Sequence, residues 1–367
     1  MRVYIKPGVS VLKDKNSNLI HFSISTSSVH KIYEFTSEYL LFIELLKIEN
    51  DVNIIFKKIQ NEFPNFSKEE FLKNIEALRL DGILIYERSV PKEFNHQNSE
   101  RYKRQVEFFG DINAVEINSW NFQLKLKKST VLILGLGGLG SWIAQYLAMA
   151  GIGRLIICDF DKIEIHNLTR QALYTTQDIG RLKTDSLEQH IKLINSDVRV
   201  DKVNIKIESE EELITLTKYF KVADVIINCI DYPDINTTSS WVSKICMQLN
   251  KPHIIGGGYS GHIGLIGPTV IPYKTACWEC ISQKYRDDLQ HDDSEILINN
   301  RKSSGAIVFL SSMIANIQSW DCINLLTGLN TPMTINRKGY LNICDFSIEW
   351  EEISRNLKCK VCGKKYE

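Results

Sequence analysis

The chain has no net charge, no long apolar run and few prolines, and these absences exclude several classes of protein. Lysine plus arginine equals aspartate plus glutamate at 44 each, so no global field attracts nucleic acid or an anionic membrane. No apolar run approaches the length of a membrane span, and the N-terminus lacks the apolar core of a signal peptide. With 8 prolines and 44% hydrophobic residues, the composition is that of an ordinary globular protein. We therefore expect a cytoplasmic enzyme with neither nucleic-acid nor membrane partners.

The sequence also shows no sign of disulfides or internal repeats. The 9 cysteines are an odd number and five of them are scattered singly; Cys158 and Cys229 fall in apolar strand patterns, which suits reduced, buried thiols. No repeat or low-complexity segment interrupts the 367 residues, a length that suffices for two domains with a core each. We expect a disulfide-free, two-domain protein.

Residues 1–88 have the pattern of a small α+β domain. Short strands are expected at Val3–Ile5 and Leu19–Ser25, around a turn region, with a closing strand at Ile83–Tyr86. Three helical segments lie between them, and Ser67 and Glu70 form a capping box at the start of the third. The helices are expected at Ser37–Lys47, Val52–Glu62 and Lys68–Leu80. This order is winged-helix-like, and the polar residues 89–100 are expected to be a linker.

From residue 101 to the C-terminus at 367 the chain has the pattern of one α/β domain. Strands and helices alternate from Thr130 onward, which predicts a mostly parallel, helix-covered, Rossmann-like sheet. Ile281–Ser304 is polar, charged and weakly periodic, and we interpret it as a loop that closes over a substrate; a solvated loop is the ordinary alternative.

The most informative segment is Thr130–Asp161, which reads strand, glycine turn, helix, strand and terminal acid. Gly135 and Gly137 allow a tight turn and let backbone N–H groups approach phosphate oxygens, while Gly140 lets the helix pack close to the sheet. Asp159 follows Gly140 by nineteen residues, where a carboxylate can accept hydrogen bonds from ribose hydroxyls. The segment alone fits a nicotinamide oxidoreductase as well as an ATP-using enzyme.

Charged residues beyond this segment favour ATP. Arg170 and Lys183 place positive charge beyond the ribose site, as a triphosphate requires, and Asn167 can donate to a phosphate or ribose oxygen. Asp231 follows an apolar strand, at the strand end where such sheets bind ligands, and can hold Mg²⁺ against the α-phosphate. Each charge alone is ordinary on a surface loop; together with the glycine turn they indicate a nucleotide site.

Two CxxC pairs form a separate signal. Cys277 and Cys280 are separated by 78 residues from Cys359 and Cys362, and each pair supplies two thiolates from one tight turn. Tetrahedral zinc takes four such ligands. We expect a closed, non-catalytic zinc site; two independent dithiols are the alternative.

These motifs in this order resemble the ubiquitin-activating-type adenylyltransferases, the ThiF, MoeB and MccB family, from about Arg101 onward. The resemblance rests on seven motifs: RYKRQ (101–105), the GLGGLG turn (135–140), DFD (159–161), NLTRQ (167–171), GRLK (180–183), Asp231 and the two CxxC pairs. It implies that a substrate carboxylate attacks the α-phosphorus of ATP, which gives an acyl-adenylate and pyrophosphate. The implied nucleotide-binding residues are Gly135, Gly137, Gly138, Gly140, Asp159, Asp161, Asn167, Arg170, Gln171, Lys183 and Asp231.

The resemblance also implies catalytic roles and a second subunit. Asp231, Lys183 and Arg170 would act on the phosphates and Mg²⁺, and Arg104 would reach the triphosphate of the neighbouring subunit, so a homodimer is implied. The chain departs from the family at two points. No arginine follows Asp231 within the next few residues, and Ile281–Ser312 holds no cysteine that could form a thioester. Release or rearrangement of the adenylate is therefore favoured.

About a hundred residues precede the RYKRQ motif, and this extension is similar to that of the MccB branch, which adenylates the C-terminal Asn of a short precursor peptide in microcin C biosynthesis. The first domain also resembles the peptide-clamp domains of ribosomally made peptide products, which bind an extended peptide by strand addition. The implied partner is a short precursor peptide. Alternatives remain open: activation of a ubiquitin-like sulfur carrier, a peptide-binding scaffold with a degenerate nucleotide site, and a first domain that only aids folding or dimerisation.

Overall fold

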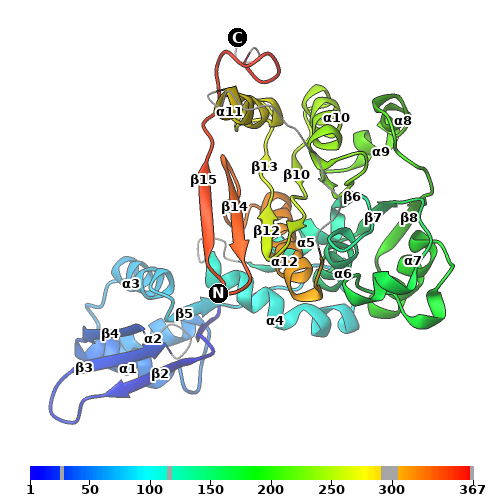
Figure 1. The fold of residues 1–367 in the computed structure, drawn as a ribbon. Helices are drawn as coiled ribbons and strands as arrows, with labels where there is room; N and C mark the ends of the chain where they lie inside the picture. Colours follow the sequence, from blue (N-terminus) through cyan, green and yellow to red (C-terminus); the bar gives the residue numbers. More distant parts are fainter. Residues whose placement is uncertain (25–28, 114–117, 291–304, 364–367) are drawn as a thin grey trace. The chain divides into compact units, whose positions relative to one another are not determined.

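The computed structural model describes residues 1–24, 29–113, 118–290 and 305–363 (Figure 1). Contacts divide the chain into two compact units, Met1–Asn121 and Phe122–Glu367. Among the described residues, no helix combines the length and the apolar character that crossing a bilayer requires.

The first unit contains two small antiparallel sheets. Its three-stranded sheet has the order β2-β3-β4, and β1 pairs separately with β5. The strands are β1 (Val3–Ile5), β2 (Val9–Lys13), β3 (Leu19–Ile24), β4 (Val29–Glu34) and β5 (Leu84–Tyr86). The sequence predicted β1, β3 and β5 but missed β2 and β4. Both are edge strands, and Leu12 and Ile32 project from them into solvent at 56% and 52% exposure, so their apolar residues do not mark one buried face.

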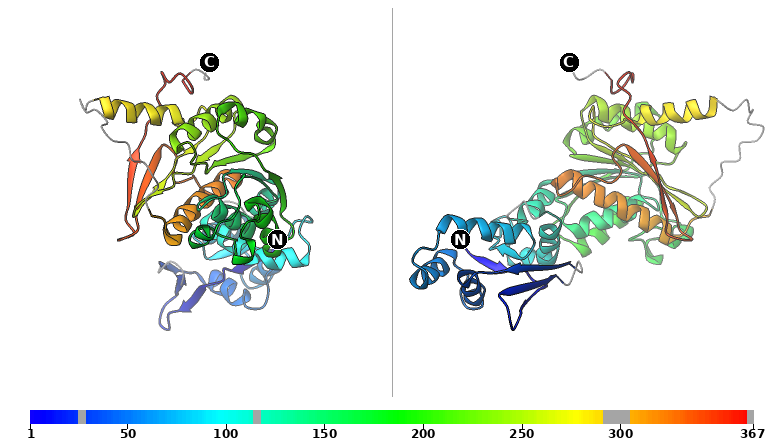
Figure 2. Two further views of the ribbon diagram at one scale, coloured as in Figure 1. Left: turned by 45° about the vertical axis from the view of Figure 1, so that its right-hand side comes forward. Right: turned by 90° about the vertical axis from the view of Figure 1, so that its left-hand side faces the viewer.

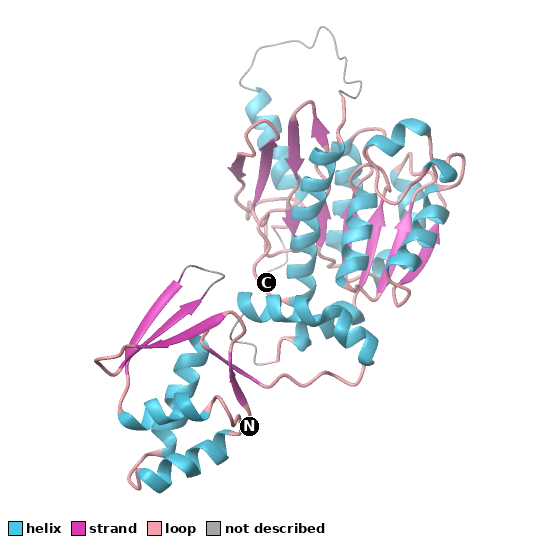
Figure 3. Cartoon of the chain, turned by 90° about the horizontal axis from the view of Figure 1, so that it is seen from below, coloured by secondary structure: helices cyan, strands magenta, loops and turns pink. Residues whose placement is uncertain are grey.

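Three helices pack against this sheet as a second layer (Figure 3). They are α1 (Ser37–Leu45), α2 (Val52–Glu62) and α3 (Lys68–Leu80). The Ser67 hydroxyl accepts from the Glu70 amide at 3.3 Å, which is one half of the predicted capping box, and the Asp51 carboxylate caps α2. Phe42 and Phe71 meet edge to face with ring centroids 5.3 Å apart in the core. An α+β N-terminal unit is therefore confirmed.

The helix α4 (His96–Ile112) carries the RYKRQ motif and belongs to the first unit. Its N-cap is Asn95, whose side chain accepts from the Asn98 amide at 2.8 Å, so the helix begins inside the stretch predicted as a linker. Tyr102 and Val106 are buried on one face, whereas Arg104 is exposed. The helix α5 (Trp120–Lys128) follows.

A six-stranded sheet with the order β13-β10-β9-β6-β7-β8 forms the centre of the second unit. Its first five strands along the chain are parallel and β13 is antiparallel, which confirms the predicted mostly parallel, Rossmann-like sheet. The strands are β6 (Thr130–Leu134), β7 (Arg154–Cys158), β8 (Arg199–Val203), β9 (Val225–Asn228), β10 (His253–Ile255) and β13 (Thr269–Val270).

Helices cover both faces of this sheet, and its central strands are accordingly apolar at nearly every position. Leu132, Ile156 and Ile226 point to one face, where they share a core with α8 (Glu210–Thr215), α9 (Thr217–Val222) and α10 (Ile235–Gln248). The helices α6 (Gly140–Ala150), α7 (Lys183–Ile194) and α12 (Val308–Thr327) pack together on the other face, and Figure 2 shows α12, in orange, running beside α6.

A four-stranded antiparallel sheet and one further helix complete the second unit. The sheet consists of β11 (Tyr259–Ser260), β12 (Ile263–Ile266), β14 (Arg337–Asn342) and β15 (Ile348–Glu352). The helix α11 (Trp278–Gln290) corrects the prediction of a loop from Ile281 onward. The apolar residues Trp278, Ile281, Tyr285 and Leu289 recur at helical spacing, so the sequence does carry a helical period, but the many charged residues between them suggested a loop. The rest of the predicted closing loop, residues 291–304, lies outside the described residues.

Candidate nucleotide site and cysteine cluster

The glycine turn lies at the carboxyl end of β6, in the middle of the sheet. Gly135 has a φ of +86°, and its amide donates to the Cys158 carbonyl at 2.8 Å. A Cβ on Gly140 would lie 1.9 Å from the Gly135 carbonyl oxygen, so only glycine lets α6 start this close to the strand. A Cβ on Gly137 would meet no atom within 4 Å, so this side of the turn has room for a ligand.

Asp159 ties the glycine turn to the end of β7. One carboxylate oxygen accepts from the Leu136 amide at 2.7 Å, and the other accepts from the Asp161 amide at 2.8 Å. Burial raises the pKa of the Asp159 carboxyl, and the charge of Lys183 opposes that rise. Each oxygen keeps a further lone pair, so a ribose contact adds to these bonds rather than replacing them.

Lys183 and Asp161 form an ion pair beside Asp159. The Lys183 ammonium lies 2.7 Å from Asp161 Oδ2, and the lysine side chain is only 6% exposed while that of Asp161 is 45% exposed. Backbone hydrogen bonds join the same two loops, from the Lys183 amide to the Asp161 carbonyl and from the Ile163 amide to the Arg181 carbonyl. The buried cation is therefore fixed in place, with its partner carboxylate facing solvent.

The NLTRQ motif forms the 3₁₀ turn η1 (Ile165–Thr169) and the residues after it. The Asn167 side chain is buried and accepts from the Glu164 amide at 3.0 Å, so it caps the turn. Gln171 is buried as well, and its Oε1 atom has no hydrogen-bond partner in the described part of the chain. Arg170 donates from Nε to the Tyr259 hydroxyl at 3.1 Å and from Nη1 to the His166 carbonyl at 3.1 Å.

Asp231 is exposed just beyond β9, the neighbour of β6 in the sheet. The chain runs from β6 to β7 and β8 on one side and returns to β9 and β10 on the other, so Asp231 and the glycine turn flank the point where the strand order reverses. Open parallel sheets bind ligands at this point. The predicted nucleotide residues thus lie at the carboxyl ends of neighbouring strands or in the loops that follow them, while Arg104 lies on α4 in the first unit.

Several residues at this edge were missed by the sequence reading. Tyr174 is buried, and its hydroxyl donates to the Leu136 carbonyl at 3.1 Å, which helps to hold the glycine turn in place. The Tyr259 hydroxyl accepts from Arg170. The Lys206 ammonium lies 5.4 Å from the Phe160 ring centroid and 5.7 Å from that of Tyr232, at the ends of β7 and β9. No spacing rule in the sequence joins these residues to the motifs, because tertiary folding alone brings them together.

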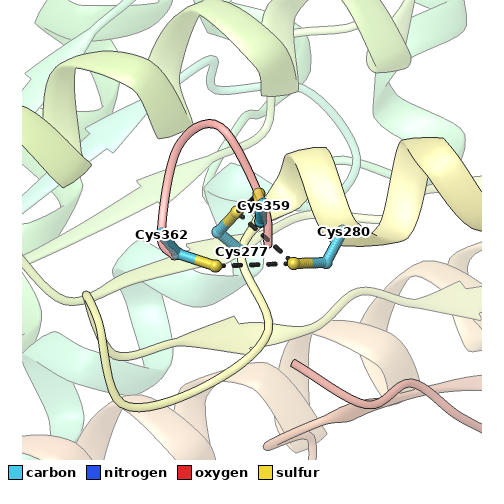
Figure 4. A group of neighbouring side chains, drawn as sticks. All are labelled: Cys277, Cys280, Cys359 and Cys362. Atoms are coloured by element: carbon cyan, nitrogen blue, oxygen red, sulfur yellow. Dashed lines mark hydrogen bonds between the residues drawn. The ribbon is translucent and has the colours of Figure 1, made fainter. Parts of the chain in front are cut away.

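The four CxxC cysteines form one buried cluster (Figure 4). Cys277 and Cys280 precede and start α11, and Cys359 and Cys362 come from the C-terminal segment. All four Sγ atoms lie within 4.8 Å of one another, with separations of 3.9, 3.7 and 3.5 Å for three pairs. Four sulfurs bound to zinc at about 2.3 Å in a tetrahedron are about 3.8 Å apart. The cluster is therefore consistent with the predicted zinc site.

The sequence is similar to those of several known proteins. The ThiF family model matches residues 102–363. The sulfur carrier protein ThiS adenylyltransferase of Escherichia coli is 30% identical over 274 residues, which cover 73% of this chain and 97% of that protein. The molybdopterin-synthase adenylyltransferase of E. coli is 27% identical over 278 residues, which cover 74% and 99%.

Solved structures of MccB match the whole chain. The crystal structure of E. coli MccB with AMPCPP and MccA has a TM-score of 0.73 at 25% identity and covers 99% of this chain and 100% of that one. The structure of E. coli MccB alone has a TM-score of 0.75 at 24% identity and covers 100% and 98%, which shows a shared fold.

A pH dependence follows from Asp178, which holds the loop before Lys183. Burial alone would raise the pKa of this carboxyl, but hydrogen bonds from Thr175 and His190 lower it from 3.8 to about 2. Because the folded-state pKa is depressed, the carboxylate stabilises the fold above the unfolded pKa near 4, and its contribution is lost as the pH falls toward 2. We expect Asp178→Asn to lower the free energy of unfolding at pH 7 by about 2 kcal/mol.

Urea unfolding at several pH values checks this expectation. The difference between the wild type and Asp178→Asn should shrink by about half at pH 3. The control is Glu62, which is exposed and accepts no side-chain hydrogen bond from the described residues, so Glu62→Gln should leave stability at pH 7 nearly unchanged. A difference between wild type and Asp178→Asn that does not change with pH would contradict the assignment.

Proposed function

The chain belongs to the ThiF family of adenylyltransferases, and we propose that the carboxylate it activates is the C-terminus of a ribosomally made precursor peptide. One observation carries the choice of a peptide. The match to the sulfur-carrier enzyme of E. coli covers 73% of this chain. The match to MccB with AMPCPP and MccA covers 99% of this chain and so includes the N-terminal unit. The function we propose is therefore MccB-like, in the biosynthesis of a microcin C-type peptide-nucleotide antibiotic.

The residues at the sheet edge suit ATP as the second substrate. The glycine turn offers backbone N–H groups and open space at Gly137, Lys183 supplies a fixed cation, and Arg170 supplies a guanidinium. In the proposed reaction a carboxylate oxygen of the peptide attacks the α-phosphorus, and the bond to the pyrophosphate oxygen breaks. The protein's part is to align the two reactants and to neutralise phosphate charge, which requires no covalent intermediate.

Asp231 would hold Mg²⁺ in this reaction. Its carboxylate is exposed at the strand edge, and an oxygen ligand of this kind is what Mg²⁺ prefers, with water and substrate phosphates as the other ligands. When bound, the ion would offset charge on the phosphates. No arginine follows Asp231 in its loop, and we assign Lys183 and Arg170 to the triphosphate instead.

The fate of the adenylate follows from the absence of a cysteine in the sequence of residues 281–312. If the peptide ends in Asn, the side-chain amide nitrogen can attack the activated carbonyl carbon, which expels AMP and closes a succinimide after loss of a proton. The succinimide nitrogen would then attack the α-phosphorus of a second ATP with release of pyrophosphate, and opening of the ring by water would leave a phosphoramidate-linked nucleotide, as in MccB-like chemistry.

The N-terminal unit offers a groove for the peptide. The cavity has a volume of about 600 Å³ and lies between the edge strand β2 and the helix α1. Val9 and Val11 line it from β2, Leu40 and Leu41 from α1, and Lys13 and Lys47 stand among the lining residues. Among the described strands β2 pairs only with β3, so its other edge could add an extended peptide, whose apolar side chains the groove would accept.

We also propose a homodimer in which Arg104 acts across subunits. Arg104 is exposed on α4, while Tyr102 and Val106 of the same motif are buried, so the motif presents a cation outward from a fixed helix. The cysteine cluster would hold one Zn²⁺, which ties the C-terminal segment to the start of α11.

Exchange of radioactive pyrophosphate into ATP tests the substrate class. We expect exchange with short peptides that end in Asn and none with the same peptides as C-terminal amides, because the amide lacks the attacking oxygen. Asp231→Ala should lower the exchange rate at least about 100-fold, since it removes the carboxylate that holds the ion. Glu349→Ala removes an exposed carboxylate of β15 and should leave the rate unchanged.

Two results would contradict the peptide assignment. Exchange with a carrier protein that ends in Gly-Gly, and with no peptide, would favour sulfur-carrier activation. The 30% sequence identity to the ThiS adenylyltransferase supports this alternative. Nucleotide binding without any exchange would favour a peptide-binding scaffold.

A pair of substitutions in β2 tests the groove. Val11 lines the groove, whereas Leu12 points to the opposite face of the sheet and is 56% exposed. We expect Val11→Ser to raise the KM for the peptide about tenfold through the loss of apolar contact, with the KM for ATP unchanged. Leu12→Ser should change neither; equal effects of both substitutions would remove the groove from the proposal.

Metal analysis of the purified protein tests the zinc site. We expect one zinc per chain, and Cys280→Ser should lose the metal and lower the melting temperature, because three ligands bind zinc far more weakly than four. The exposed Cys344 is the control, and Cys344→Ser should keep the metal. Freshly purified wild-type protein without zinc would refute the site.

A further inference from the structure

Tyr259 lies where the glycine turn and Arg170 meet. It stands on β11, and its hydroxyl oxygen would be 2.8 Å from a Cβ on Gly138. The same Cβ would lie 3.3 Å from Ser311 Oγ and 3.6 Å from Arg170 Cδ. Three side chains from separate elements thus converge over Gly138, and the absence of a side chain at this glycine is what admits the tyrosine hydroxyl.

Arg170 is held by two contacts of its guanidinium and one of its backbone. Its Nε donates to the Tyr259 hydroxyl and its Nη1 to the His166 carbonyl, each at 3.1 Å, while its own carbonyl accepts from Trp142 Nε1 at 3.0 Å. Within the described residues no group accepts from Nη2. Nη2 is therefore left for a ligand.

We propose that Tyr259 is a positioning residue, which fixes the Arg170 guanidinium so that Nη2 is ready for a phosphate oxygen at the glycine turn. This inference rests on the proposed function, since it presumes that the nucleotide binds there. The hydroxyl accepts from Nε, and the tyrosine proton stays free to donate. A guanidinium held at Nε and Nη1 before the nucleotide arrives loses less rotamer freedom on binding, so the contact strengthens.

Mg·ATP affinity measured by calorimetry tests the role without requiring turnover. We expect Tyr259→Phe to weaken Mg·ATP binding about tenfold, the effect of a displaced charged hydrogen bond, with an unchanged melting temperature. Gly138→Ala should weaken binding similarly, because its methyl group displaces the hydroxyl. Tyr146→Phe is the control, since that hydroxyl bonds Ser312 on the neighbouring helix α12.

A double-mutant cycle separates positioning from a general structural effect. Arg170→Lys removes the Nε donor, so Tyr259→Phe should weaken binding no further in that background. An equal loss in both backgrounds, or wild-type affinity for Tyr259→Phe, would overturn the proposal. If the wild type binds Mg·ATP but exchanges pyrophosphate with no substrate, the proposed function fails, and the double-mutant cycle still decides the role of Tyr259. A wild type that does not bind Mg·ATP overturns the proposed function and the role of Tyr259 together.

Discussion

The close approach of α6 to the end of β6 is the constraint on which the candidate site depends. Gly140 permits it, because a Cβ there would overlap the Gly135 carbonyl oxygen at 1.9 Å. The Asp159 carboxylate then fixes the turn by accepting from the Leu136 amide, and Tyr174 supports the same residue through its carbonyl. The start of α6 is in this way held at the carboxyl end of a central strand, and a helix N-terminus so placed is the arrangement that binds phosphate.

Positive charge is placed around this turn by side chains whose other contacts are already made. Lys183 is nearly buried and pairs with Asp161, and Arg170 is held by Tyr259 and a backbone carbonyl. Such preorganised cations stabilise developing charge without reorganising at the moment of reaction. Two carboxylates at the same edge differ in environment, since Asp159 is bonded to backbone amides and Asp231 is exposed. The first suits a structural role with a ribose contact, and the second suits a metal ion.

The sequence predicted the parts of the fold in which local pattern and tertiary burial agree. The strands β6 and β9 are apolar at nearly every position, and the helices α2 and α3 have the predicted bounds. The edge strands β2 and β4 were missed because both of their faces carry apolar residues. The helix α11 was missed because its charged residues were given more weight than the helical spacing of its few apolar ones. Local pattern is weakest where an element lies at an edge.

The residues of the candidate site likewise divide into those that the sequence could predict and those that it could not. Residues in compact motifs, such as the glycine turn and Lys183, could be found from spacing, because the sheet topology always places strand ends together. Tyr259 comes from a different sheet, and nothing in its local sequence indicates that it meets Gly138. The cysteine cluster was found from two distant pairs because zinc chemistry requires four ligands, a condition that acts across any sequence separation.

The claim that this sheet edge binds a triphosphate is tested most directly by titrating the protein with Mg·ATP and with NADH in a calorimeter, with Lys183→Ala alongside the wild type. The account predicts heat of binding for Mg·ATP, none for NADH, and a much weaker interaction of ATP with Lys183→Ala. Binding of NADH with no response to ATP would contradict it.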